Sequence, residues 1–187
     1  EDKEAFSDDN ENPFDKITYV REFSSEKFST LVLPFVPDQI DQLEVYKLSE
    51  QNDNNLIFEE VDVFVPGTPY MVKVKGENVS LSELTGTKQM ITKNEQGYIV
   101  EAGDWNMIGT YSRLELNASD ANGMGRRFYY YTSADGGKFL YATGSLVVSP
   151  FRTYIDGPIV DKANNVRMMT RRFDGMETEI DVVELED

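Results

Sequence analysis

The segment "GDWN" at residues 103–106 carries the side chains best suited to ligand recognition in this sequence. Trp105 is the single tryptophan of the chain and is flanked by Asp104 and Asn106. An exposed indole can stack on the apolar face of a sugar ring, while neighbouring carboxylate and amide groups bond to the sugar hydroxyls. The segment therefore predicts that Trp105 and Asp104 contact a glycan. The alternative is that Trp105 anchors the core.

The aromatic run "FYYY" at residues 128–131 offers a second candidate surface. In a β-strand, Tyr129 and Tyr131 point to the face opposite Phe128 and Tyr130. If the sheet is covered on one side only, one of these faces is exposed and can stack on a ligand. We therefore include Tyr129 and Tyr131 among the candidate binding residues. The alternative is cross-strand pairing with aromatic residues of the next strand.

Arginines are concentrated in the last third of the chain. They are Arg126, Arg127, Arg152, Arg167, Arg171 and Arg172. A guanidinium group recognises carboxylates or sulfates through paired hydrogen bonds, so these residues could bind an acidic glycan. The alternative is that they pair with the protein's own Asp and Glu residues. Arg152, which follows Pro150 and Phe151, completes the set of candidate ligand-binding residues.

The sequence contains neither histidine nor cysteine. It therefore lacks the nucleophile–base pairs of serine and cysteine hydrolases and the commonest zinc ligands. We predict no catalytic residues, no metal site and no cofactor. A glycoside hydrolase that uses two facing carboxylates is the weaker alternative. Its candidates by residue type are Glu59, Glu60, Asp104 and Asp120.

The chain is strongly acidic, with 34 Asp and Glu against 18 Lys and Arg and a formal net charge of −16 over 187 residues. This charge argues against nucleic acids and anionic membrane surfaces as partners. Residues 1–15 are predicted to be an acidic flexible leader, and residues 16–187 a single folded domain. No apolar run approaches the roughly 20 residues of a membrane-spanning helix. We expect an exported protein whose export signal lies upstream.

Hydrophobic residues recur with a period of two along much of the chain. In residues 70–75, Tyr70, Val72 and Val74 share one face of a strand, with Met71 as an exception. Glycines recur about every ten residues between these short segments, a spacing typical of β-sandwiches and barrels. The prediction is an all-β antiparallel sandwich, jelly-roll-like or with an added small sheet, and with little or no helix. Residues 38–50 are expected to form at most one helical turn after Pro37.

The stretch "LVVSPFRTYI" at residues 146–155 predicts a corner. Its apolar residues change parity at Ser149-Pro150, so a regular strand would expose half of them. A bulge or corner restores the phase and tolerates the missing proline N–H. The stretch is then one strand bent around the sandwich, or one crossing between its sheets. Separately, Asp135-Gly136-Gly137 predicts the turn of a hairpin.

Several motifs together resemble a known group of domains. They are "ITYVREF" (17–23), "STLVLPF" (29–35), "PGTPYMVKV" (66–74), "MIGTY" (107–111), "GGKFLYA" (136–142) and "VSPFRTYI" (148–155). In this order they resemble the β-rich domains of exported and cell-surface proteins of Bacteroidetes, which often accompany surface leucine-rich-repeat proteins of the adhesin type. The resemblance implies an envelope-associated β-sandwich with a role in adhesion or glycan contact, and it implies no catalytic residue.

These observations predict a non-catalytic binding or adhesion module at the cell surface, either extracellular or attached to the envelope. Its partner would be a glycan or a surface protein. The alternative is a structural or assembly component of the envelope that binds no small ligand. The sequence leaves the oligomeric state open.

Overall fold

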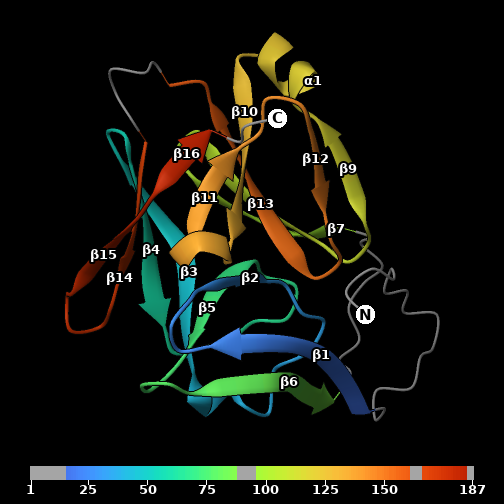
Figure 1. The fold of residues 1–187 in the computed structure, drawn as a ribbon, viewed down its shortest axis with the longest axis vertical. Helices are drawn as coiled ribbons and strands as arrows, with labels where there is room; N and C mark the ends of the chain where they lie inside the picture. Colours follow the sequence, from blue (N-terminus) through green and yellow to red (C-terminus); the bar gives the residue numbers. More distant parts are fainter. Residues whose placement is uncertain (1–15, 88–95, 161–165, 185–187) are drawn as a thin grey trace.

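The chain folds into four β-sheets, which confirms the predicted all-β class. The computed structural model describes residues 16–87, 96–160 and 166–184, and the predicted acidic leader lies outside these ranges. Two large sheets have six strands each, and two ribbons have two strands each. Figure 1 shows the β1–β6 ribbon at the bottom of the molecule and the β9–β12 ribbon at the upper right.

The first large sheet is mostly antiparallel, but β14 and β4 are parallel. Its strands in spatial order are β15 (Glu177–Ile180), β14 (Arg167–Arg171), β4 (Asn55–Val61), β3 (Leu43–Asn52), β5 (Tyr70–Val74) and β2 (Ser29–Leu31).

The second large sheet is also mostly antiparallel, with one parallel pair formed by β16 and β11. Its strands in spatial order are β16 (Val182–Glu184), β11 (Lys138–Tyr141), β10 (Arg126–Thr132), β13 (Arg152–Pro158), β8 (Trp105–Thr110) and β7 (Gln96–Ala102). The ribbons pair β1 (Lys16–Ser24) with β6 (Ser80–Thr87), and β9 (Leu114–Asn117) with β12 (Ser145–Val148).

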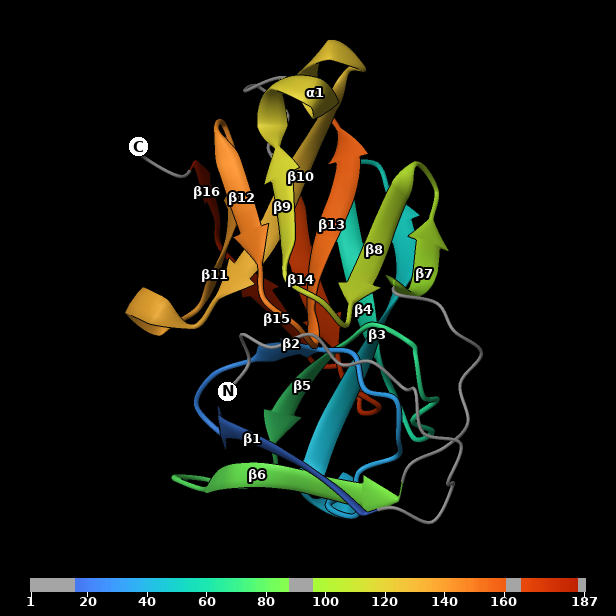
Figure 2. The same cartoon turned by 90° about the vertical axis from the view of Figure 1, so that its right-hand side faces the viewer.

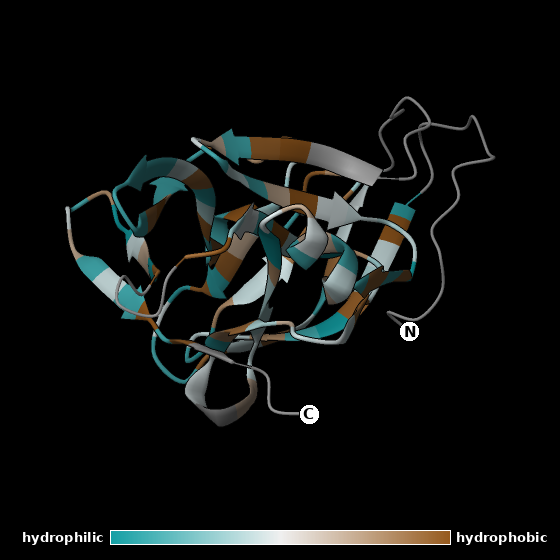
Figure 3. Ribbon diagram, turned by 90° about the horizontal axis from the view of Figure 1, so that it is seen from above, coloured by the Kyte–Doolittle hydropathy of each residue, from teal (hydrophilic) through white to brown (hydrophobic). Residues whose placement is uncertain are grey.

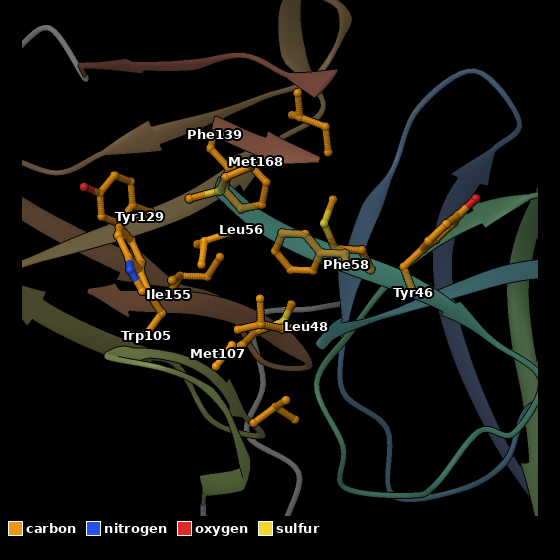
Figure 4. Packing of buried hydrophobic residues seen from close by; sticks show 14 of the residues in the cluster. Tyr46, Leu48, Leu56, Phe58, Trp105, Met107, Tyr129, Phe139, Ile155 and Met168 are labelled. Carbon is orange, nitrogen blue, oxygen red and sulfur yellow. The ribbon is translucent and has the colours of Figure 1, made fainter. Parts of the chain in front are cut away.

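Three apolar clusters join the sheets into layers. The central core lies between the two large sheets (Figure 4) and contains Leu48, Leu56, Phe58 and Met168 from the first, with Trp105, Met107, Tyr129, Phe139 and Ile155 from the second. A second core packs the β1–β6 ribbon on the first large sheet through Tyr19, Phe23, Leu84, Val45 and Val72. A third core packs the β9–β12 ribbon on the second large sheet through Leu146, Val148, Phe128, Tyr130 and Tyr154.

Because each large sheet lies between two cores, its strands are apolar on both faces. Tyr70 and Val72 belong to the core under the β1–β6 ribbon, whereas Met71 belongs to the central core. Met71 departs from the period-two pattern because it lies on the second face of the strand, which is also buried. Seen from above, hydrophobic and hydrophilic stretches alternate along several strands (Figure 3).

The stretch at residues 146–155 crosses between two sheets, one of the two predicted arrangements. Its first half is β12 of the small ribbon and its second half is β13 of the second large sheet. Phe151 makes the corner with a left-handed backbone at φ 64°. Its N–H donates to Thr110 O at 2.7 Å, and its carbonyl accepts from Val32 N at 3.1 Å. These two bonds hold a conformation that is unfavourable for a bulky residue.

The helical content is small. A 3₁₀ turn at Ile40–Gln42 precedes β3, which confirms the single turn expected after Pro37. The short α-helix α1 (Ala118–Gly123) was not predicted, and its N-cap is Asn117, whose side chain accepts a bond from Ser119 N. A further 3₁₀ turn at Ala134–Gly136 connects β10 with β11, where the hairpin was predicted. Over the described ranges, no helix is long and apolar enough to span a membrane.

The contact between Trp105 and Gly157 generates a prediction about packing. A Cβ atom on Gly157 would overlap the buried indole ring, which has no room to move. Gly157→Ala should lower the free energy of unfolding by roughly 1–3 kcal/mol, the usual cost of overpacking, measured as a lower urea midpoint. Gly123→Ala is the matched control, because a Cβ atom there meets no atom within 4 Å. Equal midpoints for both variants would contradict this account.

Candidate functional site

Trp105 lies in the central core and is only 2% exposed. Gly103 turns the chain with φ 58°, and β8 then begins with the indole directed between the large sheets. The ring lies 5.3 Å from that of Tyr129, centroid to centroid (Figure 4), and covers Gly157. The predicted sugar-stacking role of Trp105 is therefore wrong, because its ring cannot reach a ligand. The alternative, that Trp105 anchors the core, is confirmed.

The tyrosine hairpin also faces inward. Tyr129 is buried in the central core and Tyr131 is half-buried against it. Their rings meet those of Tyr141 and Phe139 on β11, at centroid distances of 6.1 and 5.4 Å. Burial raises the pKa of both tyrosines. The predicted exposed face of Tyr129 and Tyr131 is wrong, since the β9–β12 ribbon covers the opposite face and cross-strand pairing accounts for both rings.

Asp104 and Arg152 lie far apart. Asp104 is exposed in the β7–β8 turn, where its N–H donates to Gln51 Oε1 at 3.2 Å and its carbonyl accepts from Arg126 Nη2 at 2.9 Å. Arg152 is half-buried at the start of β13, opposite Thr110. Gly157, beside Trp105, is five residues further along this strand, which corresponds to roughly 16 Å. The five predicted site residues therefore do not form one site.

Most of the clustered arginines pair with the protein's own acidic groups, as the alternative predicted. Arg126 Nε bonds to Asp156 Oδ1 at 2.7 Å, and Arg167 Nη2 to Glu179 Oε2 at 2.7 Å. Arg171 contacts three glutamates, Glu59 and Glu177 at 3.0 Å and Glu50 at 3.7 Å. Arg172 lies 3.7 Å from Asp174, and Arg127 lies 4.4 Å from the ring centroid of Tyr141. These pairings account for the concentration of arginines without an acidic glycan.

A groove of about 420 Å³ lies where β3 and β4 of the first large sheet meet β7 of the second. This volume is within the usual range of ligand sites. The residues that line it are Lys47, Leu48 and Ser49 of β3, Glu59, Glu60 and Val61 of β4, and Ile99, Val100 and Glu101 of β7. Figure 2 shows β7 at the side of the molecule next to the upper part of β3. We call this site the β3–β7 groove.

Two strand edges border the groove. β5 pairs with β3 only over Leu43–Tyr46, so among the described residues no strand bonds to that edge of β3 beyond Tyr46. β7 is the last strand of its sheet, and its one described partner is β8. The bond between Asp104 N–H and Gln51 joins the two sheets at one end of this arrangement. The groove therefore offers backbone donors and acceptors as well as side chains.

The polar rim of the groove is mainly acidic. Ser49 Oγ donates to Glu59 Oε2 at 2.6 Å, and Arg171 Nη1 donates to Glu59 Oε1 at 3.0 Å. These two bonds lower the pKa of the Glu59 carboxyl, the hydrogen bond from Ser49 most strongly. Glu60 Oε2 accepts from Phe173 N at 2.9 Å. Within the described ranges, Lys47 and Glu101 form no salt bridge.

The lowered pKa of Glu59 bears on the hydrolase alternative. A glycosidase acid must keep its proton near neutral pH, which requires a raised pKa. Glu59 has the opposite shift, because its ionised form is hydrogen-bonded. Asp104 and Asp120 do not line the groove. Among the described residues, no group of three or more acidic side chains could hold a metal ion.

Sequence reasoning did not find the groove. Its lining comes from three segments that no local pattern connects, around residues 47–49, 59–61 and 99–101. Glu59 and Glu60 were considered only as residues of a suitable type. One signal was available: in "YIVEA" at residues 98–102, strand alternation would place the apolar Ile99 beside the charged Glu101 on one face.

The bond from Ser49 generates a second prediction. Ser49→Ala removes a donor to the ionised carboxylate, so the pKa of Glu59 should rise toward its ordinary value, followed by NMR titration of the side-chain carboxyl. Since the folded pKa of Glu59 is lowered, its stabilising contribution is complete above the ordinary pKa of 4.5. It is lost as the pH falls through the lowered value. As the pH falls through this range, the free energy of unfolding of Ser49→Ala should therefore decrease by less than that of the wild-type protein. Ser82→Ala on β6 serves as the control, and a Glu59 pKa that is the same in both variants would refute the assignment.

Comparisons with known proteins give no relative from which a role could be transferred. No family model matches the sequence, no curated protein matches it, and no solved structure matches the fold. The resemblance to Bacteroidetes surface domains therefore stays a prediction from sequence motifs.

Proposed function

We propose that this protein is a non-catalytic binding module of the cell surface, and that its ligand occupies the β3–β7 groove. The observation that carries the proposal is the groove itself, which combines an apolar wall with polar groups on its rim. Ile99 is 53% exposed there and gives the groove an apolar side chain that a ligand can cover. Export and attachment to the envelope are part of the proposal and derive from the motif resemblance.

An assembly role is the second candidate, and one observation favours it. β7 and the second half of β3 each have an edge with no described partner strand, and assembly components add strands from partners through such edges. Both roles place the contact at the same groove. The binding module takes a glycan or a segment of a surface protein there, whereas the assembly component joins parts of the envelope and binds no small ligand.

The test is an NMR titration of the ¹⁵N-labelled protein with a panel of neutral, acidic and amino-sugar oligosaccharides and short peptides. A ligand of the groove should shift the amide signals of residues 47–49 and 99–101 and leave those of the β1–β6 ribbon unchanged. Glu101→Lys should weaken the binding of a cationic ligand at least tenfold, because it reverses a charge on the rim. Ile99→Lys should weaken the binding of any ligand that packs against the apolar wall of the groove.

Glu83→Lys is the matched control, since it makes the same charge change at an exposed position of β6, outside the groove. Equal weakening by Glu83→Lys and Glu101→Lys would indicate a general charge effect. Shifts confined to other surfaces, or none across the panel, would refute the proposed site.

A further inference from the structure

The edges that border the groove suggest how a ligand would bind. In an antiparallel pair, alternate residues of a strand direct their N–H and C=O groups to the partner, and the others direct them away. β7 pairs with β8 through Ile99↔Ile108, Val100↔Met107 and Glu101↔Asn106. The residues of β7 that do not bond to β8 therefore direct their backbone groups toward the other edge of this strand, which borders the groove. The same holds for β3 from Lys47 onward, where the pairing with β5 has ended.

The groove has the form expected of a site for an extended chain. It touches three consecutive residues of each of β7, β3 and β4. β4 pairs with a strand on both sides, but β7 and the part of β3 beyond Tyr46 each have one edge with no described partner strand. A ligand lying there can add to the sheet as a further strand.

The side chains around the groove define the chemistry of the ligand. Three carboxylates, Glu59, Glu60 and Glu101, stand against the ammonium group of Lys47 and the guanidinium group of Arg171, which bonds to Glu59. The lowered pKa of Glu59 keeps it ionised at neutral pH. A basic ligand is therefore favoured, and the net charge of −16 opposes the docking of a second copy of this acidic chain. Charged residues at an edge select against self-association in this way.

The accessible apolar side chains of the groove, and the absence of aromatic side chains from its lining, favour a peptide over a sugar as the ligand. Ile99 and Val61 are accessible beside the carboxylates, so they can pack against the aliphatic part of a lysine or arginine side chain. The residues that line the groove include no aromatic side chain, and sugar recognition depends largely on aromatic stacking.

We infer that the β3–β7 groove binds an extended basic segment of a partner protein, which adds as a strand to the edge of β7 and places its basic side chains against Glu59 and Glu101. This inference rests on the proposed function, because it names the ligand class of the same groove. It does not depend on any catalytic step.

The probe is the peptide acetyl-Lys-Val-Lys-Val-Lys-amide, titrated into the full chain by calorimetry and by NMR. We expect saturable binding that shifts the amide signals of residues 99–101. The Glu-for-Lys version of the peptide should bind at least tenfold more weakly, and higher salt should weaken the Lys peptide. Glu101→Gln should reduce the affinity for the Lys peptide, while Glu83→Gln should not. Urea midpoints of both variants confirm that each one is folded.

Two backbone-methylated peptides test the strand addition directly. One peptide carries N-methyl groups on the lysine amides and the other on the valine amides. Because lysine and valine alternate, each peptide lacks the backbone N–H donors that point to one side of the strand. If the peptide adds to the edge, one version should lose at least tenfold in affinity and the other should lose much less. Equal affinity for both, or equal loss, would overturn strand addition.

A chitosan oligosaccharide separates this inference from the proposed function, because it carries amino groups but no peptide backbone. If it shifts residues 99–101 while the Lys peptide does not bind at millimolar concentration, the inference fails and the groove remains a binding site. If neither ligand and no member of the oligosaccharide and peptide panel shifts the signals of the groove residues, both proposals fail.

Discussion

The requirement to bury both faces of two large sheets determines most of this structure. A sheet that is apolar on one face needs a single partner layer, but here the first large sheet contributes Met71 to one core and Val72 to another. The β1–β6 and β9–β12 ribbons meet this requirement by covering the outer faces. Without them, Val45 and Tyr154 would lie in water.

The candidate site lies where this coverage ends. The two large sheets pack face to face through the central core, but the pairing of β5 with β3 stops at Tyr46 and β7 has no described strand beyond it. The groove therefore follows from the topology and not from a local motif. Its acidity then determines which chains can approach, because an unprotected edge would otherwise pair with any exposed strand.

The sequence predicted the local features of the fold and missed the features that depend on tertiary contact. The turn at Asp135-Gly136-Gly137 and the corner after Ser149-Pro150 follow from backbone rules, and both occur where expected. Trp105 shows why the site prediction failed. The period-two alternation along β8 determines on which face of the strand the indole lies. It cannot show whether that face is exposed when both faces of the strand are buried. The groove joins residues about fifty positions apart, so no linear spacing contains it.

The parallel pairing of β4 with β14 also constrains how the chain can fold. Arg171 on β14 bonds to Glu59 on β4 across 112 residues of sequence. A nascent chain in which β14 has not yet been synthesised therefore leaves Leu56 and Phe58 without Met168 beside them. Contacts between such distant segments slow folding, because a long loop must close before they form. The first large sheet can therefore form in full only after β14 and β15 have been synthesised, and until then the faces of Leu56 and Phe58 that pack on Met168 stay uncovered.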